Sequence, residues 1–211
     1  EVDRCLAHAG DAAQLAVRLP FIHETYAQPA IVEDFIDGRE FHVSVWGNDS
    51  LFVLPVAEMD FSFFNDVKDR LCTYDSKFIP GSRHYEKIET RLPAPLCSEE
   101  QQALEKVCCD AYRTLGCRDY ARMDIRLRDG VFYVLDVNPN ADISHEASMA
   151  CAAEVAGMSY GQMGSRIVRM AARRHPVFGR AAFGREGDKK KTAARRPRMR
   201  RVSPLRTPRT S

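Results

Sequence analysis

The segment from residue 120 to residue 138 constrains the fold of this chain more than any other, because it predicts a β-hairpin. Two runs rich in apolar residues flank the pair Asp129-Gly130. An Asp-Gly pair between such runs is a strong hairpin signal, since glycine adopts the positive φ that the tight turn requires. The chain should therefore contain an antiparallel sheet with this hairpin as a part of it.

Four polar side chains of the hairpin form a chemically specific group. Side chains alternate faces along a strand, so Arg122 and Asp124 share one face, and Asp136 and Asn138 share another or the same one. Two carboxylates and an amide oxygen suit a hard divalent cation such as Mg²⁺, and a neighbouring cation suits phosphate. The pattern therefore indicates nucleotide chemistry, with an ordinary hairpin that has a charged solvent face as the alternative.

The length of the turn decides whether the two pairs meet. A three-residue loop over residues 129–131 sets Asp124 opposite Asp136. A strict two-residue turn sets Asp124 opposite Leu135 and divides the site, because a shift of one residue moves a side chain to the other face. The sequence does not fix this register, and we predict the three-residue loop.

Composition indicates a globular protein with reduced cysteines. The chain is 45% hydrophobic and 28% charged, and it has no run of about 18 apolar residues, so no membrane span is predicted. The seven cysteines include no Cys-x-x-Cys pair, which favours free thiols in a cytoplasmic protein over a disulfide scaffold or a zinc site. Because the chain starts at Glu1 without a Met, we expect upstream sequence to be missing.

The charge of the chain is divided unevenly. Residues 176–211 hold 12 Lys and Arg against Glu186 and Asp188, whereas the remainder holds 19 basic and 27 acidic residues. The last segment buries too little apolar surface to offset its ordering entropy. We therefore predict a folded domain over residues 1–175 and a disordered basic tail over residues 176–211. The tail is interpreted as a solvated segment, or alternatively as an arm for nucleic acid.

The remaining pattern predicts an α+β fold, an antiparallel sheet with helices packed on it. The predicted elements, besides the hairpin, are helices over 1–19, 98–115 and 159–174 and strands over 30–36, 40–46 and 51–57. Ser98 is the predicted N-cap of the middle helix, because it precedes acidic residues that suit a helix start. His42 falls on a strand pattern and is interpreted as structural.

Several segments occur in a recognisable order. They are IVEDFIDGREF (31–41), YDSKF (74–78), RMD (122–124) and DVNPN (136–140), followed by AGMSY (156–160). Together they resemble the ATP-grasp superfamily, and within it the D-alanine–D-alanine ligase-like enzymes. The match covers about residues 10–172 and implies the C-terminal half of an ATP-grasp fold.

The resemblance implies a nucleotide-binding role for several residues. Glu33, Asp34 and Ile36 would belong to the hinge whose backbone hydrogen-bonds the edge of adenine. Glu40 would accept hydrogen bonds from the ribose hydroxyls, and Lys77 would be a positive charge near the phosphates.

The resemblance also implies the catalytic and metal residues. Asp124, Asp136 and Asn138 would hold Mg²⁺, or alternatively Mn²⁺, and Arg122 would stabilise charge on the transferring phosphoryl group or on the tetrahedral intermediate. The implied reaction is ATP-dependent ligation: a carboxylate is phosphorylated to an acyl phosphate, and an amine then attacks to form a peptide-like amide. Positioning and electrostatics supply most of the rate in such a scheme, so no nucleophilic side chain is required.

The segment after Asn138 departs from the dipeptide ligases. It reads Ala-Asp-Ile-Ser-His (141–145) where those enzymes have a Pro-Gly pair and a serine-bearing loop. A second hypothesis is therefore an ATP-grasp protein that binds ATP without catalysis, and a third is a nucleic-acid-associated protein that acts through its tail. The expected partner is a small amino acid or carboxylate substrate, in the cytoplasm and without a membrane. A homodimer is one of the oligomeric states left open.

Overall fold

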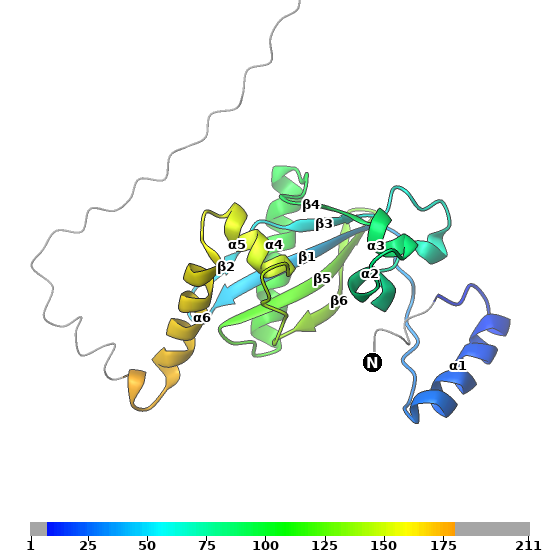
Figure 1. Ribbon diagram of the computed structural model, residues 1–211, viewed down its shortest axis with the longest axis horizontal. Helices are drawn as coiled ribbons and strands as arrows, with labels where there is room; N and C mark the ends of the chain where they lie inside the picture. The colour runs from blue at the N-terminus through cyan, green and yellow to red at the C-terminus, as the bar shows by residue number, and fades with distance from the viewer. Residues whose placement is uncertain (1–7, 180–211) are drawn as a thin grey trace, which may run out of the picture. The chain divides into compact units, whose positions relative to one another are not determined.

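The computed structural model describes residues 8–179 (Figure 1). Its elements are α1 (Ala12–Tyr26), β1 (Arg39–Gly47), β2 (Leu51–Val53), β3 (Ala57–Asp60), η2 (Val67–Asp69), α2 (Tyr74–Phe78), α3 (Arg83–Lys87), β4 (Glu89–Arg91), α4 (Ser98–Thr114), β5 (Tyr120–Arg128), β6 (Val131–Asn138), α5 (Ser148–Val155) and α6 (Tyr160–Arg174). The strands form one antiparallel sheet in the order β4-β3-β1-β5-β6, with β2 also paired to β1. The predicted α+β class is confirmed.

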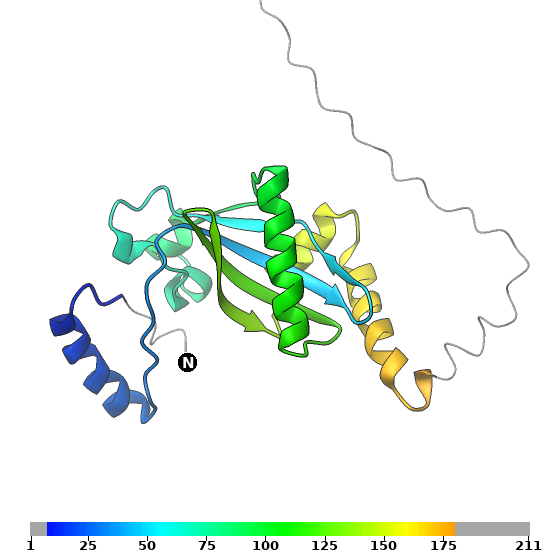
Figure 2. The ribbon, with the colours of Figure 1, turned by 180° about the vertical axis from the view of Figure 1, so that it is seen from behind.

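The two faces of the sheet are covered by different helices. Helix α4 runs across one face, and α5 and α6 lie toward the other (Figures 1 and 2). The α4 side is a core in which Phe41 and Val43 of β1 and Met123 of β5 pack against Leu104 and Cys108. Because side chains alternate along a strand, the even-numbered residues of β1 and β5 lie on the face opposite α4. The polar residues of the predicted site are therefore separated from the α4 core.

The β5–β6 hairpin has the predicted pairing of strands but a different turn length, and a β-bulge makes up the difference. Arg128 pairs with Val131, so the turn has two residues rather than three, and both turn residues have positive φ (52° and 76°). Further along, Ile125 pairs with Val134, but Asp124 pairs with Asp136. Leu135 is thus an extra residue in β6, a β-bulge that shifts the register by one. The predicted loop length was wrong, whereas the predicted pairing of the two aspartates is confirmed.

The segment before β1 is irregular, although its sequence predicted a strand over residues 30–36. The carbonyls of Phe35 and Ile36 accept hydrogen bonds from the side chains of Arg128 and Arg126, at 3.5 and 2.7 Å. These arginine side chains replace the neighbouring strand that a β-ladder would need. Phe35 and Ile36 are therefore held by arginine side chains and not by a neighbouring strand.

Three other boundaries differ from the sequence prediction. The first helix begins after its N-cap Asp11 and continues to Tyr26 with Pro20 inside it, instead of spanning 1–19. The predicted strand 51–57 is divided into β2 and β3 by a segment containing Pro55, which has no N–H for a ladder. The N-cap of α4 is Cys97, whose Sγ accepts from the N–H of Glu100 at 3.4 Å, and not Ser98.

The C-terminal part of the chain is described only in part. The chain divides after Ala171 into two compact units, so the division falls within α6. Helix α6 confirms the helix predicted over 159–174, with Met163 and Met170 buried. The predicted boundary at residue 176 stays a prediction, and the tail predicted to be disordered lies mostly outside the described residues. Among residues 8–179 no helix combines the length and hydrophobicity needed to cross a membrane.

Candidate active site

The hairpin brings the four predicted residues together on the face of the sheet opposite α4. Arg122 is paired with Asn138 across the two strands, and Asp124 with Asp136. Arg122 also donates two hydrogen bonds to Asp124, from Nε to Oδ1 at 2.8 Å and from a terminal nitrogen to Oδ2 at 3.0 Å. This bidentate ion pair is largely buried, with about one sixth of each side chain exposed (17% and 16%).

The electrostatics of this group keep Arg122 charged. Burial alone would lower the pKa of Arg122, but the carboxylates of Asp124 and Asp136 raise it above its ordinary value. The two bonds to Asp124 use two of the five N–H donors of the guanidinium, so other donors can face a phosphoryl oxygen. Likewise a carboxylate has about four lone-pair directions, so Asp124 can bind a cation while it is paired with Arg122.

Arg126, two positions beyond Asp124 on the same face, forms the most buried ion pair of the described residues. It is 1% exposed and Glu40 is 5% exposed. Its Nε and one terminal nitrogen donate to Glu40 Oε2 at 2.8 and 2.7 Å. The guanidinium also donates to the carbonyl of Arg70, and its centre lies 4.7 Å from the ring of Phe35 and 5.5 Å from that of Phe61.

Arg126 donates hydrogen bonds to two residues that the family resemblance predicts to bind nucleotide. Glu40 was predicted to contact ribose, and Ile36 to belong to the adenine-binding hinge. Both accept hydrogen bonds from Arg126, Ile36 through its carbonyl at 2.7 Å, and their predicted roles toward nucleotide stay predictions. The hinge residues Glu33 and Asp34 are exposed. The side chain of Lys77 lies outside the described part of the chain.

Glu40 is strongly held in its ionised form. Burial would raise the pKa of Glu40, but the neighbouring His42 and the charge of Arg126 together lower it to about 2. Sequence reasoning missed Arg126 because charged residues at every second position of a strand usually face solvent. The signal that could have been used is its alternation with Arg122 and Asp124, which places it on the same face.

His42 links the two ion pairs. It lies opposite Asp124 in the β1–β5 ladder, and its Nε2 is 3.7 Å from Glu40 Oε1 and 4.0 Å from Asp124 Oδ1. Its other ring nitrogen, Nδ1, is 3.2 Å from the hydroxyl of Ser148 at the start of α5. The site is thus a continuous polar network across β1 and β5 that reaches the start of α5.

The loop after β6 is ordered by its own side chains. Asp142 accepts hydrogen bonds from the N–H and the hydroxyl of Ser144, at 2.8 and 3.0 Å. These bonds, with a smaller contribution from the charge of Arg122, lower the pKa of Asp142 below its ordinary value. The negative charge of Asp142 is therefore a stable feature of the loop.

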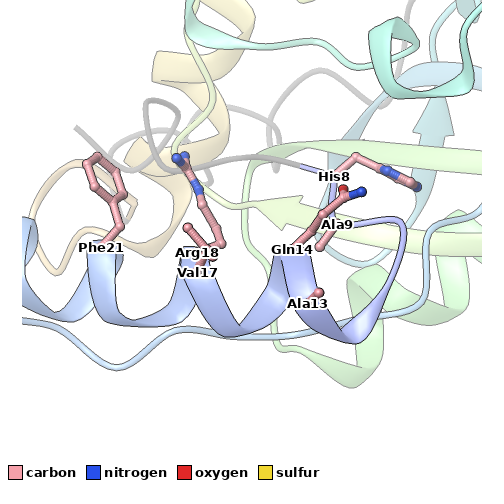
Figure 3. Close-up of a pocket in the computed structure, with 7 residues that line it drawn as sticks. All are labelled: His8, Ala9, Ala13, Gln14, Val17, Arg18 and Phe21. Atoms are coloured by element: carbon pink, nitrogen blue, oxygen red, sulfur yellow. The ribbon is translucent and has the colours of Figure 1, made fainter.

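A separate pocket lies along α1 (Figure 3). It is lined by His8, Ala9, Ala13, Gln14, Val17, Arg18 and Phe21. None of the residues predicted to bind nucleotide or metal lines it, so it does not mark the candidate site.

Comparison with known proteins places the chain in a family. Residues 14–169 match the family described as "D-ala D-ala ligase C-terminus". The chain therefore belongs to the D-alanine–D-alanine ligase C-terminal family, as its ATP-grasp motifs indicated.

Individual relatives agree with this assignment. The chain is 34% identical over 175 residues to the uncharacterized protein y4sG of Sinorhizobium fredii, covering 82% of this chain and 49% of that protein. It is 33% identical over 143 residues to a D-alanine–D-alanine ligase of Pseudothermotoga lettingae, covering 68% of this chain and 45% of the ligase. The chain thus spans about half the length of these relatives.

Solved structures share the fold. A D-alanine–D-alanine ligase from Bacillus anthracis, complexed with ATP, superposes with a TM-score of 0.60 at 21% identity, over 77% of this chain and 47% of that one. The VanG D-Ala:D-Ser ligase from Enterococcus faecalis gives a TM-score of 0.56 at 21% identity, over 76% of this chain and 43% of that one. The predicted C-terminal ATP-grasp architecture is confirmed.

Proposed function

We propose that this chain is the C-terminal part of an ATP- and Mg²⁺-dependent ligase that joins a carboxylate to an amine through an acyl phosphate. The observation that supports this most is the pairing of Arg122 with Asn138 and of Asp124 with Asp136 across one hairpin. Oxygen ligands on rigid, neighbouring strands would suit a divalent cation that accompanies a nucleotide.

The donor set fits Mg²⁺. Asp124, Asp136 and Asn138 supply carboxylate and amide oxygens, with Asp136 exposed to incoming nucleotide. When bound, the ion neutralises charge on the phosphates and orients them for transfer. Asn138 Oδ1 accepts from the N–H of Asn140 at 3.0 Å, which fixes the direction of its side chain.

Arg122 is the proposed catalytic residue. Its guanidinium is held by Asp124 on one side, which leaves the other donors to stabilise charge on the transferring phosphoryl group. The substrate is a small amino acid or another carboxylate. The charge of Asp142 stands where a dipeptide ligase presents glycine, so we propose a substrate other than D-alanine.

Calorimetry of Mg·ATP binding tests the metal and nucleotide assignment. The variant Asp136→Asn removes a ligand charge and should weaken Mg-dependent binding by about tenfold or more. Asp129→Asn is the matched control, because it makes the same chemical change in the turn of the same hairpin, where asparagine tolerates the positive φ of 52°. Equal effects of the two substitutions, or no Mg·ATP binding by the longest available form of the protein, would reject the assignment.

A second candidate function is ATP binding without ligation. It is favoured by Asp142 in the loop after β6 and by the engagement of Glu40 with Arg126. Release of ADP that depends on added amino acids, measured on the longest available form of the protein, separates the two candidates. Binding of Mg·ATP with no such release across the amino acids tested would favour the non-catalytic function.

A further inference from the structure

Three potential metal ligands converge beside the hairpin site, from two segments distant in sequence. Glu40 and His42 lie on the same face of β1, and Cys72 lies in the loop between η2 and α2. One ligand atom of each, namely a carboxylate oxygen, a ring nitrogen and the sulfur, lies within 4.8 Å of the other two. Atoms that share one zinc ion are roughly 3.5 Å apart, so small side-chain movements would complete such a site.

The buried ring nitrogen of His42 is an independent observation. His42 is 8% exposed, and its Nε2 has no hydrogen-bond partner within the described chain. Leaving a buried polar atom without a partner costs about 1–3 kcal/mol, so such atoms usually have a role. The nearest oxygen of Glu40 is 3.7 Å away, beyond hydrogen-bond distance but suitable for an ion between the two.

Two outer contacts orient these ligands. Nδ1 of His42 can donate to Ser148 Oγ at 3.2 Å, and in that tautomer the lone pair is on Nε2, toward Glu40 and Cys72. Arg126 binds Oε2 of Glu40 and directs Oε1 toward His42. Outer-shell contacts of this kind typically accompany metal-ligating histidines and carboxylates.

We propose that Glu40, His42 and Cys72 form a binding site for a divalent transition metal of the Zn²⁺ class. Thiolate and imidazole ligands select Zn²⁺ over Mg²⁺, which prefers oxygen. Binding releases the thiol proton of Cys72 to solvent and forms one metal–sulfur bond. The fourth position takes water or Asp124, whose Oδ1 is 4.0 Å from the same His42 nitrogen.

This site goes beyond the proposed ligase function. Its ligand Glu40 is also the residue expected to contact ribose, so Zn²⁺ and Mg·ATP should exclude one another. Cysteine spacing in the sequence argued against zinc because no Cys-x-x-Cys pair exists. The ligands found here are 30 positions apart along the chain, between His42 and Cys72, and only the fold brings them together.

Titration with Co²⁺ tests the site without nucleotide, in excess Mg²⁺. One Co²⁺ per chain should bind and give a near-ultraviolet thiolate-to-metal charge-transfer band. Cys72→Ser should abolish the band, whereas Cys109→Ser, a half-buried thiol on α4, should leave it unchanged. A band that persists in Cys72→Ser, or the absence of any band in the unsubstituted chain, overturns the proposal and leaves His42 as a structural partner of the two carboxylates.

A milder variant guards against loss of folding. Ser148→Ala keeps all three ligands and should weaken Co²⁺ binding by about 10–100-fold, as outer-shell changes do.

Circular dichroism confirms the fold of each variant, and Zn²⁺ should raise the melting temperature of the unsubstituted chain but not that of Cys72→Ser. Asp136→Asn should retain the Co²⁺ band, so failure of the zinc site and failure of the nucleotide site are distinguished. Unchanged Co²⁺ affinity in Ser148→Ala together with an unchanged band in Cys72→Ser counts against the site.

Discussion

The substitution Arg126→Met should destabilise the fold more than any surface change in this chain. It removes the positive charge from an ion pair in which Arg126 is 1% and Glu40 5% exposed. Breaking a buried pair by removing one partner costs about 3–5 kcal/mol, because the other charge stays buried without compensation. The carbonyls of Ile36 and Arg70 lose a donor as well, which adds to the loss.

A double-mutant cycle isolates the ion pair from these other losses. Glu40→Gln alone should also destabilise, but Glu40→Gln combined with Arg126→Met should recover at least about 2 kcal/mol relative to the sum of the two single effects. Urea unfolding followed by fluorescence of Trp46, the single tryptophan and 1% exposed, measures all four proteins. The cycle is run in chelator, so that no metal contributes.

The outcome that refutes this reasoning is simple additivity. If the effects of the two single substitutions sum to that of the double variant within about 0.5 kcal/mol, the charges do not interact in the folded protein. A loss below about 1 kcal/mol for Arg126→Met would show that the side chain is solvated, contrary to its burial in the structure. Lys106→Met provides the surface control, because its pair with Asp110 is exposed and should contribute little.

Two further predictions concern pH and backbone packing. In the folded protein the pKa of Glu40 is about 2, against an ordinary 4.5, so its ionised form contributes about 3 kcal/mol to the free energy of unfolding. This contribution is present above pH 4.5 and is lost as the pH falls toward 2. Urea unfolding at several pH values should show this dependence, and Glu40→Gln should reduce it. Gly38→Ala should lower the free energy of unfolding by about 1–3 kcal/mol or more, since the added Cβ would lie 2.1 Å from the carbonyl oxygen of Leu127. Gly161→Ala on α6 is the control, because its added Cβ would have no neighbour among the described residues within 4 Å, apart from adjacent residues and its own helix backbone, and should not destabilise the protein. Thermal unfolding measures both. Equal melting temperatures for the two glycine variants would contradict the close approach.

Local chemistry made much of this fold predictable. The Asp-Gly turn of the β5–β6 hairpin, the acidic residues at the start of α4 and the helix pattern over 159–174 are all short-range signals, and all three elements are present. The alternation of Arg122 and Asp124 also predicted correctly that both lie on one face. These features need only neighbours within a few positions of the chain.

Features that depend on distant residues were not predictable. The sequence of residues 30–36 predicted a strand, but the carbonyls of Phe35 and Ile36 bind arginine side chains some 90 positions later. The pairing of Arg126 with Glu40, and the approach of Cys72 to His42, likewise follow from sheet order and loop placement. A single sequence contains no local signal for such contacts, so the charged environment of Glu40 was missed.

The bulge at Leu135 has a consequence for how this hairpin can vary among proteins of the family. A two-residue turn with one extra residue in β6 and a three-residue turn without it give the same pairing of Asp124 with Asp136. An insertion of one residue at the turn is therefore compensated by a deletion of one residue from β6. Relatives with a longer turn should lack the bulge, and a change of either one alone would move the carboxylate of one strand to the opposite face.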